Sequence, residues 1–497
     1  MALNPQQQKS LHEMLAKINN AIEKNNTTAA LKKLLELDQK IPNNPMVLSL
    51  IGKAQGKMGR HAETIAAYEK AVKFKPKDGE LRFFYAHALQ KGGCYEEALT
   101  EYERALYHAP KSYNALRHKC SVLVDLDRID DAHKAFKKLR EFVSKNDINE
   151  NQAIGVEIAC ARLSPKAIEP KEAIDGLNKY VNNEQCAINM RTAALWQVGR
   201  LYDVLGEYDN AFEAYKQCKE LEKTDWDVEL HTKRIDQLIN CWTNDANIPF
   251  STLDGSNMIF IVGMMRSGTS LTEQMLAQID GLTPGGEMNA ITRQIIPIDP
   301  SSMHNSRPYA LTRSKYTKAT IQKMANSAHA MYAKVPHTKY LTDKQPFNYA
   351  HVPLIAHLFP GCKIIHCIRD PLDCCLSNFT QAFARPHMQT NDLYWIGRYY
   401  RDYERVMKAW HTLPEVDMID LHYEELVSDP ETQARRVLEF LDMEWTPEIL
   451  NFHKSTRTVN TASRDQVRQP MYTTSVQKYK RYEHHLDELK RGLGIKE

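Results

Sequence analysis

The stretch 258–271, MIFIVGMMRSGTSL, combines residue types that bind a phosphate group. A short apolar run of strand type ends at Gly263, a second glycine follows at Gly268, and a helix-compatible segment comes next. Backbone N–H groups in such a strand-to-helix loop, together with the positive end of the helix dipole, favour an anion. The loop also contributes hydroxyl donors and a permanently ionised guanidinium, from Arg266, Ser267, Thr269 and Ser270. We therefore predict a phosphate-binding loop.

The loop lacks the lysine of the GxxxxGK[ST] motif found in nucleotide triphosphatases. Thr269 stands at the position of that lysine. An ATP- or GTP-dependent kinase or switch would also need a carboxylate for magnesium, and none is evident in the sequence. The missing lysine disfavours a triphosphate site, although a kinase or switch remains an alternative to test.

The loop resembles the 5′-phosphosulfate loop of sulfotransferases that use 3′-phosphoadenosine 5′-phosphosulfate (PAPS). The resemblance covers about 257–485, in the family's order. IRDPLDCCLSNF is similar to the element that binds the 3′-phosphate, with Arg369 and Ser377 eight residues apart and Ser377 expected at or near the start of a helix. The C-terminal half resembles bacterial-type sulfotransferases fused to tetratricopeptide repeats, and its active-site pieces resemble those of tyrosylprotein sulfotransferases.

The resemblance implies specific roles. Glu287 in GGEMNAI is the expected catalytic base, which would remove the proton of an attacking hydroxyl. Lys344 in TDKQP and Arg266 would stabilise charge on the transferred group and the bridging oxygen, with Ser463 donating a hydrogen bond nearby. The implied cofactor-binding residues are Arg266, Ser267, Gly268, Thr269, Ser270, Arg369, Ser377, Tyr423, Ser463 and Lys478.

No metal is expected, because the built-in cations replace the Walker lysine and its magnesium. The histidines His351, His357 and His366 lack the spacing of a metal motif and are interpreted as packing or surface residues. The chain departs from the tyrosylprotein enzymes at Gln381, where they carry an arginine, and the loop's usual proline and its neighbour are replaced by Met264 and Met265.

The implied reaction is transfer of a sulfuryl group from PAPS to an acceptor hydroxyl, with release of PAP. A protein or peptide tyrosine is the favoured acceptor, and a saccharide or small-molecule alcohol is the alternative. An inactive scaffold is a third possibility, which the intact Arg266, Glu287, Lys344 and Arg369 disfavour.

Parallel strands must bring these distant residues together. After residue 257, short apolar runs alternate with helical segments, in MIFIVG, KYLTDKQP, CKIIHCIRD and VDMIDLHYEEL. Buried strands that alternate with helices predict an α/β domain, P-loop-like, with a mostly parallel sheet covered on both faces.

The N-terminal half repeats. Pro42, Pro76 and Pro110 recur at intervals of 34 residues, as do pairs of Gly, Ala and Tyr. This pattern resembles the tetratricopeptide repeat (TPR), an all-α superhelix whose concave face commonly docks a peptide or protein. We expect four or five units between about 11 and 225, with an irregular patch near 140–190, and a role in docking or homodimerisation.

Two domains are predicted for the 497 residues: a TPR domain over 1–244 and a PAPS-dependent sulfotransferase domain over 245–497. A formal net charge of +3 gives no reason to expect a nucleic-acid or membrane partner. The polar N-terminus has no signal-type apolar run, and the 10 cysteines are scattered, with Cys374 and Cys375 expected to pack rather than bridge. We therefore expect a cytoplasmic protein.

Overall fold

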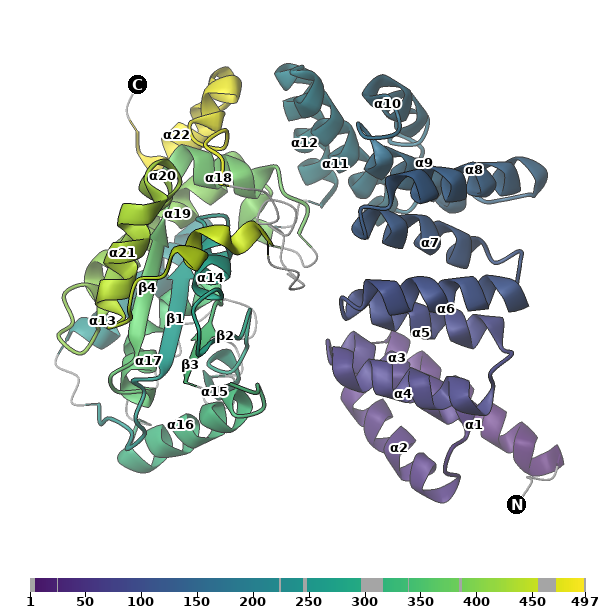
Figure 1. Ribbon diagram of the computed structural model, residues 1–497, viewed down its shortest axis with the longest axis horizontal. Helices are drawn as coiled ribbons and strands as arrows, with labels where there is room; N and C mark the ends of the chain where they lie inside the picture. The colour runs from purple at the N-terminus through teal and green to yellow at the C-terminus, as the bar shows by residue number, and fades with distance from the viewer. Residues whose placement is uncertain are drawn as a thin grey trace. The chain divides into compact units, whose positions relative to one another are not determined.

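The computed structural model describes residues 5–24, 26–222, 225–244, 248–295, 316–337, 339–383, 387–454 and 471–495. The chain divides into two compact units, Met1–Glu207 and Tyr208–Glu497. Figure 1 shows the helices of the first unit and the sheet of the second. Among the described helices, none is long and apolar enough to cross a lipid bilayer.

The first unit is all-helical, and consecutive helices pack on one another along the chain. Its helices are α1 (Pro5–Glu23), α2 (Thr27–Lys40), α3 (Pro45–Lys57), α4 (His61–Phe74), α5 (Gly79–Lys91), α6 (Tyr95–His108), α7 (Tyr113–Asp125), α8 (Ile129–Lys145), α9 (Glu150–Leu163), α10 (Pro170–Asn178) and α11 (Ile188–Leu205). The predicted repeat architecture is confirmed, and the irregular patch is also helical.

The repeat period is visible in the helix caps as well as in the core. Asn44, Asp78 and Ser112 stand 34 residues apart, and each accepts a backbone N–H in the first turn of the helix that follows. A Cβ added at Gly52 would lie 2.7 Å from the ring of Tyr68, so the tyrosine fills space that the glycine leaves. The spacing of small and aromatic residues therefore sets how closely neighbouring helices approach.

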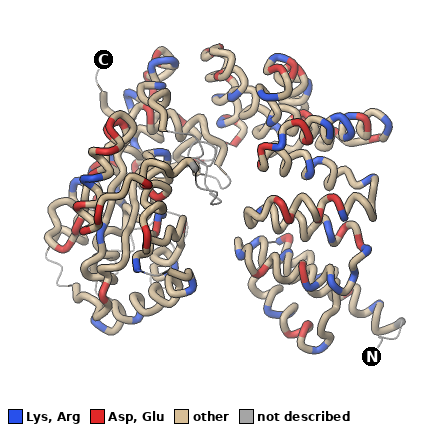
Figure 2. The backbone as a smooth tube through the Cα atoms, viewed as in Figure 1, with Lys and Arg blue, Asp and Glu red and all other residues tan. Residues whose placement is uncertain are grey.

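Basic and acidic residues are interspersed along the helices of this unit (Figure 2). One buried pair joins α5 to α6, where Arg82 Nη1 lies 2.5 Å from Glu101 Oε2. Glu101 also accepts from Arg104 at 2.6 Å, so its buried carboxylate is compensated by two guanidinium groups.

The second unit is built on a five-stranded parallel sheet with strand order β2-β3-β1-β4-β5. The strands are β1 (Met258–Gly263), β2 (Leu282–Pro284), β3 (Tyr340–Asp343), β4 (Lys363–Ile368) and β5 (Met418–His422). The main helices are α12 (Tyr208–Glu222), α13 (Val228–Thr243), α14 (Thr269–Leu276), α16 (Lys318–Tyr332), α17 (Val352–Leu358), α18 (Pro371–Phe379), α19 (Leu393–Trp410), α20 (Tyr423–Ser428), α21 (Pro430–Phe440) and α22 (Asp487–Leu493). Shorter elements are α15 (Thr292–Ile295) and the 3-10 helices η3 (Pro346–His351), η4 (Met388–Thr390), η5 (Pro447–Lys454) and η6 (Lys478–His485).

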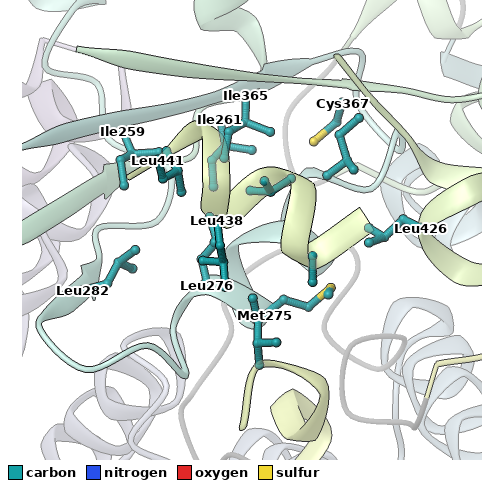
Figure 3. Packing of buried hydrophobic residues seen from close by; sticks show 14 of the residues in the cluster. Ile259, Ile261, Met275, Leu276, Leu282, Ile365, Cys367, Leu426, Leu438 and Leu441 are labelled. Carbon is teal, nitrogen blue, oxygen red and sulfur yellow. The ribbon is translucent and has the colours of Figure 1, made fainter. Parts of the chain in front are cut away.

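Helices cover both faces of the sheet. On one face, Ile259 and Ile261 of β1 pack with residues of β4, α14 and α21, as Figure 3 shows. On the other, Phe260 contacts the rings of Tyr332 and Phe359. All six residues of β1 are buried because both faces of the strand are covered, which explains its uninterrupted apolar sequence.

The predicted parallel sheet is confirmed, and the four predicted strand regions contain β1, β3, β4 and β5. The three-residue β2 is an addition that the sequence analysis did not identify. It pairs with β3 through the register Thr283↔Leu341, and the short run LTP carries too little pattern to mark a strand.

Helices α12 and α13 belong to the second compact unit, although the sequence assigns residues 1–244 to the repeat domain. Lys219 of α12 donates to the carbonyl of Gln381 at 3.1 Å, and Thr232 of α13 donates to Asp402 at 2.8 Å. The repeat pattern in α12 predicts which side of the helix is apolar. The contacts of the folded chain show that α12 packs in the second unit. The last helix before β1 ends at Thr243, where the helical periodicity of the sequence also stops.

Candidate active site

Among the described residues, predicted site residues gather at the carboxyl edge of the sheet. Each strand is followed there by one of them: Arg266 after β1, Glu287 after β2, Lys344 after β3, Arg369 after β4 and Tyr423 after β5. All carboxyl ends of a parallel sheet meet at one edge, and open α/β sheets bind their ligands there.

The loop between β1 and α14 has the backbone of an anion site. Arg266 and Gly268 have φ angles of 68° and 102°, in the left-handed region. A Cβ added at Gly268 would lie 2.9 Å from the ring of Tyr423, so glycine is required both by conformation and by space. Thr269 and Ser270 are the first two residues of α14, so their backbone N–H groups lie at the positive end of the helix. Both residues are buried.

The two methionines of this loop have structural roles that the sequence did not reveal. Met264 and Met265 are 1% and 8% exposed. The Met264 carbonyl accepts from Ser267 Oγ at 2.8 Å, and the Met265 carbonyl accepts from Asn378 Nδ2 at 2.8 Å. The first contact closes the loop on itself, and the second holds its backbone against α18.

The loop and the predicted 3′-phosphate element are in direct contact. Arg266 Nε donates to Ser377 Oγ at 3.1 Å, and Arg369 Nη1 donates to the carbonyl of Arg266 at 3.1 Å. The guanidinium of Arg369 lies 4.8 Å from the ring centre of Tyr423 and donates to the carbonyl of Ser475 at 2.7 Å. Four predicted cofactor residues therefore form one cluster.

This cluster is suited to an anion. Desolvation, and then the charge of Arg369, lowers the pKa of the Arg266 guanidinium to about 10. The Nε of Arg369 is buried and has no hydrogen-bond partner in the described part of the chain. Two neighbouring guanidinium groups and an unsatisfied N–H fit a phosphate or sulfate group, which would neutralise the charge and accept the free donor.

Ser377 does not lie at or near the start of its helix, contrary to the sequence prediction. Helix α18 begins at Pro371, and Asp370 caps it by accepting from the N–H of Asp373 at 3.0 Å. Ser377 therefore lies in the last turn of α18. A proline favours the first helical position after an Asp cap, so the Asp-Pro pair starts the helix earlier than expected.

The backbone on either side of Lys478 is anchored to the same helix. Asp373 of α18 accepts from the N–H of Gln477 at 2.6 Å and from the N–H of Tyr479 at 2.9 Å. Asp373 and Ser377 stand one turn apart on α18, so Lys478 begins η6 close to the predicted 3′-phosphate element.

Glu287 and Lys344 form an ion pair, with 2.7 Å between Glu287 Oε1 and Lys344 Nζ. The lysine side chain is fully buried, whereas the glutamate side chain is 44% exposed. A fixed cation beside an accessible carboxylate offers both a proton acceptor and positive charge at one place. Ser463, the remaining predicted catalytic residue, lies outside the described residues.

Several residues of this region were missed by the sequence analysis. Asn378 anchors the loop, Asp373 anchors the segment around Lys478, and Glu273 of α14 accepts from the turn before Glu287. No signal in the sequence singles out Glu273, because its neighbours Thr272 and Gln274 are also polar and also buried.

His366 is buried on β4, as its interpretation as a packing residue requires. Its Nδ1 lies 2.7 Å from Asp420 Oδ1, and His411 Nε2 lies 3.0 Å from the same oxygen. These three side chains could offer ligand atoms to a metal ion, but they are already at hydrogen-bonding distances from one another.

Replacing Asp343 by asparagine should make the stability of the protein less dependent on pH. Asp343 is fully buried beside Lys344, and its burial raises its pKa to about 7. The native state then binds a proton that the unfolded chain releases near pH ~4, so the contribution of Asp343 to stability falls as pH rises from about 4 to about 7. Asparagine cannot lose this proton and can still accept from the hydroxyl of Tyr332.

Thermal unfolding at about pH 5 and about pH 8 measures this effect. Relative to the wild type, Asp343→Asn should have a melting temperature that is more favoured at the higher pH, because it lacks the loss that ionisation of Asp343 causes. Asp487→Asn, at an exposed position of α22, should behave as the wild type. Parallel pH profiles for wild type and Asp343→Asn would contradict the assignment.

Residues 258–447 match the model of the sulfotransferase family, and residues 57–120 and 192–225 match tetratricopeptide-repeat models. An uncharacterized protein of Aquifex aeolicus is 31% identical over 330 residues, covering 63% of this chain and 43% of that protein. Protein-tyrosine sulfotransferase A of Caenorhabditis elegans is 26% identical, covering 42% of this chain and 58% of its own length. Protein-tyrosine sulfotransferase 1 of Danio rerio is 26% identical, covering 42% and 59%. The chain thus spans about half the length of these relatives.

Proposed function

We propose that this chain, which carries a domain of the sulfotransferase family together with tetratricopeptide repeats, transfers the sulfuryl group of PAPS to a hydroxyl of a protein or peptide. The observation that carries the proposal is the convergence of two arginines and a Lys–Glu ion pair at one sheet edge. The arginine cluster suits the anionic groups of the donor, and the ion pair suits proton removal and charge stabilisation.

PAPS would supply the sulfuryl group and would be held by the loop after β1, the cluster of Arg266, Arg369 and Ser377, and Lys478. Glu287 would accept the proton of the acceptor hydroxyl, because its carboxylate is accessible and fixed beside a cation. Lys344, fully buried and paired with Glu287, would provide positive charge where negative charge develops. Holding donor and acceptor in one geometry would supply a further part of the rate enhancement.

The acceptor is proposed to be a tyrosine of a protein or peptide. Support comes from the relatives named protein-tyrosine sulfotransferases and from the repeat unit, an architecture that commonly docks polypeptides. Incubation of the full chain with sulfur-labelled PAPS and a lysate of the source cells, followed by separation of macromolecules from small molecules, tests this proposal. Label on tyrosine of a protein supports it, and label only in saccharides or low-mass alcohols would replace it with the alternative acceptor.

We also propose a reducing compartment, the cytoplasm, as the place of this reaction. All ten cysteines are free, and Cys374 and Cys375 are buried residues of α18, packed as expected. Ten unpaired cysteines are more typical of proteins kept under reducing conditions.

Wild-type protein should be stabilised more by PAP than by ADP at equal concentration, and Arg369→Ala should remove most of this difference. A ligand that binds the native state raises the melting temperature according to its affinity. Loss of one charge-assisted hydrogen bond costs about 1.5–3 kcal/mol, so the affinity for PAP should fall about 10- to 100-fold while that for ADP changes less. Thermal shift and titration calorimetry measure both.

The control is Arg491→Ala, which removes an exposed arginine of α22 and should leave the preference for PAP intact. A shift with ATP and magnesium but none with PAP would overturn the proposed function in favour of a nucleoside triphosphate site.

A further inference from the structure

We propose that Glu273 of α14 is a positioning residue that holds the Lys344–Glu287 pair in its reactive geometry. The inference rests on the proposed function and extends it to a residue that contacts neither the donor loop's anion cluster nor the ion pair itself. Glu273 is 3% exposed, and its carboxylate reaches from the helix after the loop to the turn before Glu287 and to β3, the strand before Lys344.

A single oxygen of Glu273 accepts from the turn after β2 and from β3. Its Oε1 lies 2.8 Å from the N–H nitrogen of Gly286, the residue before Glu287. The same Oε1 lies 2.8 Å from the hydroxyl of Thr342, two residues before Lys344. One carboxylate oxygen therefore joins the segment that carries the base to the strand that carries the lysine.

The turn between β2 and Glu287 is held against β3 by two further backbone hydrogen bonds. Gly285 N–H donates to the carbonyl of Thr342 at 3.1 Å, and Lys344 N–H donates to the carbonyl of Gly286 at 2.9 Å. A Cβ at Gly285 would lie 2.2 Å from the Thr342 oxygen, so only glycine permits this approach. Within this turn, the Gly286 N–H has Glu273 as its acceptor.

Glu273 also links this turn to the donor site through its helix. It stands one turn after Thr269, the first residue of α14, and α14 begins directly after the phosphate-type loop. Any shift of the loop and helix would therefore be passed to the turn that carries Glu287. The Glu273 side chain therefore ties the helix that follows the donor loop to the turn that carries the base.

Removing the carboxylate should misplace the base without removing it. In Glu273→Ala, the N–H of Gly286 and the hydroxyl of Thr342 both lose this hydrogen-bond acceptor. An unsatisfied donor in a buried region is unfavourable, so the turn should shift. Because a displacement of about 1 Å in a catalytic group can cost about 100-fold, kcat should fall about 10- to 100-fold. The KM for PAPS should change much less, since the arginine cluster is untouched.

Two conservative variants separate reach from charge. Glu273→Gln keeps an oxygen at the same reach and loses the charge, so it should retain most of the wild-type kcat. Glu273→Asp keeps the charge but shortens the side chain by one methylene, so it should behave like Glu273→Ala. The opposite order, with Asp near wild type and Gln impaired, would overturn the positioning role.

Backbone hydrogen exchange provides a readout that does not depend on activity. Exchange of the peptide that covers Gly285–Glu287 should be at least about tenfold faster in Glu273→Ala and Glu273→Asp, and near wild type in Glu273→Gln. Asp402→Ala is the control, because Asp402 is a buried carboxylate that accepts from Thr232 of α13. It should lower stability without changing kcat or exchange of the turn.

The outcomes distinguish the two proposals. Unchanged exchange of Gly285–Glu287 in Glu273→Ala overturns the role of Glu273, whatever the activity. Wild-type kcat in Glu273→Ala also overturns it. Absence of sulfuryl transfer by wild-type protein with every acceptor tested would count against the proposed function, while the exchange experiment would still decide whether Glu273 holds the turn.

Discussion

Glu287→Gln should lower kcat for sulfuryl transfer by about 100- to 10,000-fold, the range expected for loss of a positioned general base. Glutamine preserves the size of the side chain and can still accept a hydrogen bond from Lys344, which lies 2.7 Å from the carboxylate oxygen. It cannot take up the proton of the acceptor hydroxyl. The protein should fold normally, because the glutamate side chain is 44% exposed and supports little of the core.

The measurement is turnover with labelled PAPS, together with calorimetric titration of PAP. Affinity for PAP should be nearly unchanged, because the arginine cluster that would hold its phosphates is separate from Glu287. Glu439→Gln, at an exposed position of α21, serves as the matched control and should keep wild-type kcat. A Glu287→Gln enzyme with near wild-type turnover would exclude Glu287 as the base.

Lys344→Met should lower kcat by about 100- to 1,000-fold, as removal of one preorganised electrostatic donor does in other enzymes. Methionine keeps an unbranched apolar side chain in a position that is fully buried, and it removes only the charge. Glu287 then loses its cationic neighbour but remains partly in contact with water. The loss of stability should therefore be smaller than that caused by leaving a fully buried charge without a partner.

Lys363→Met is the matched control for this lysine. Lys363 begins β4, at the amino end of the sheet, and pairs with Asp417 at 2.9 Å. Its replacement removes an ion pair from the same sheet at the edge remote from the site, so kcat should not change. Equal losses of kcat in Lys344→Met and Lys363→Met would show that the effect comes from sheet stability rather than from charge at the site.

The sequence alone determined those features of the protein that are encoded locally. The loop after β1 could be predicted because a buried strand, two glycines and a helix follow one another within a few residues. The repeat helices could be predicted because their small and aromatic residues recur every 34 residues. Strand β2 could not be predicted, since a three-residue strand is defined by its pairing with β3 rather than by its own pattern.

Only the tertiary structure decided which of the predicted residues touch. Glu287 and Lys344 are 57 residues apart and form an ion pair because β2 and β3 are parallel neighbours with their carboxyl ends at one edge. Arg266 and Arg369, 103 residues apart, meet for the same reason at the ends of β1 and β4. The contacts of Glu273 could not be derived from its sequence position, because a buried carboxylate is defined by the donors that the fold brings to it. The sequence thus specified the chemical groups, and the parallel sheet specified their distances.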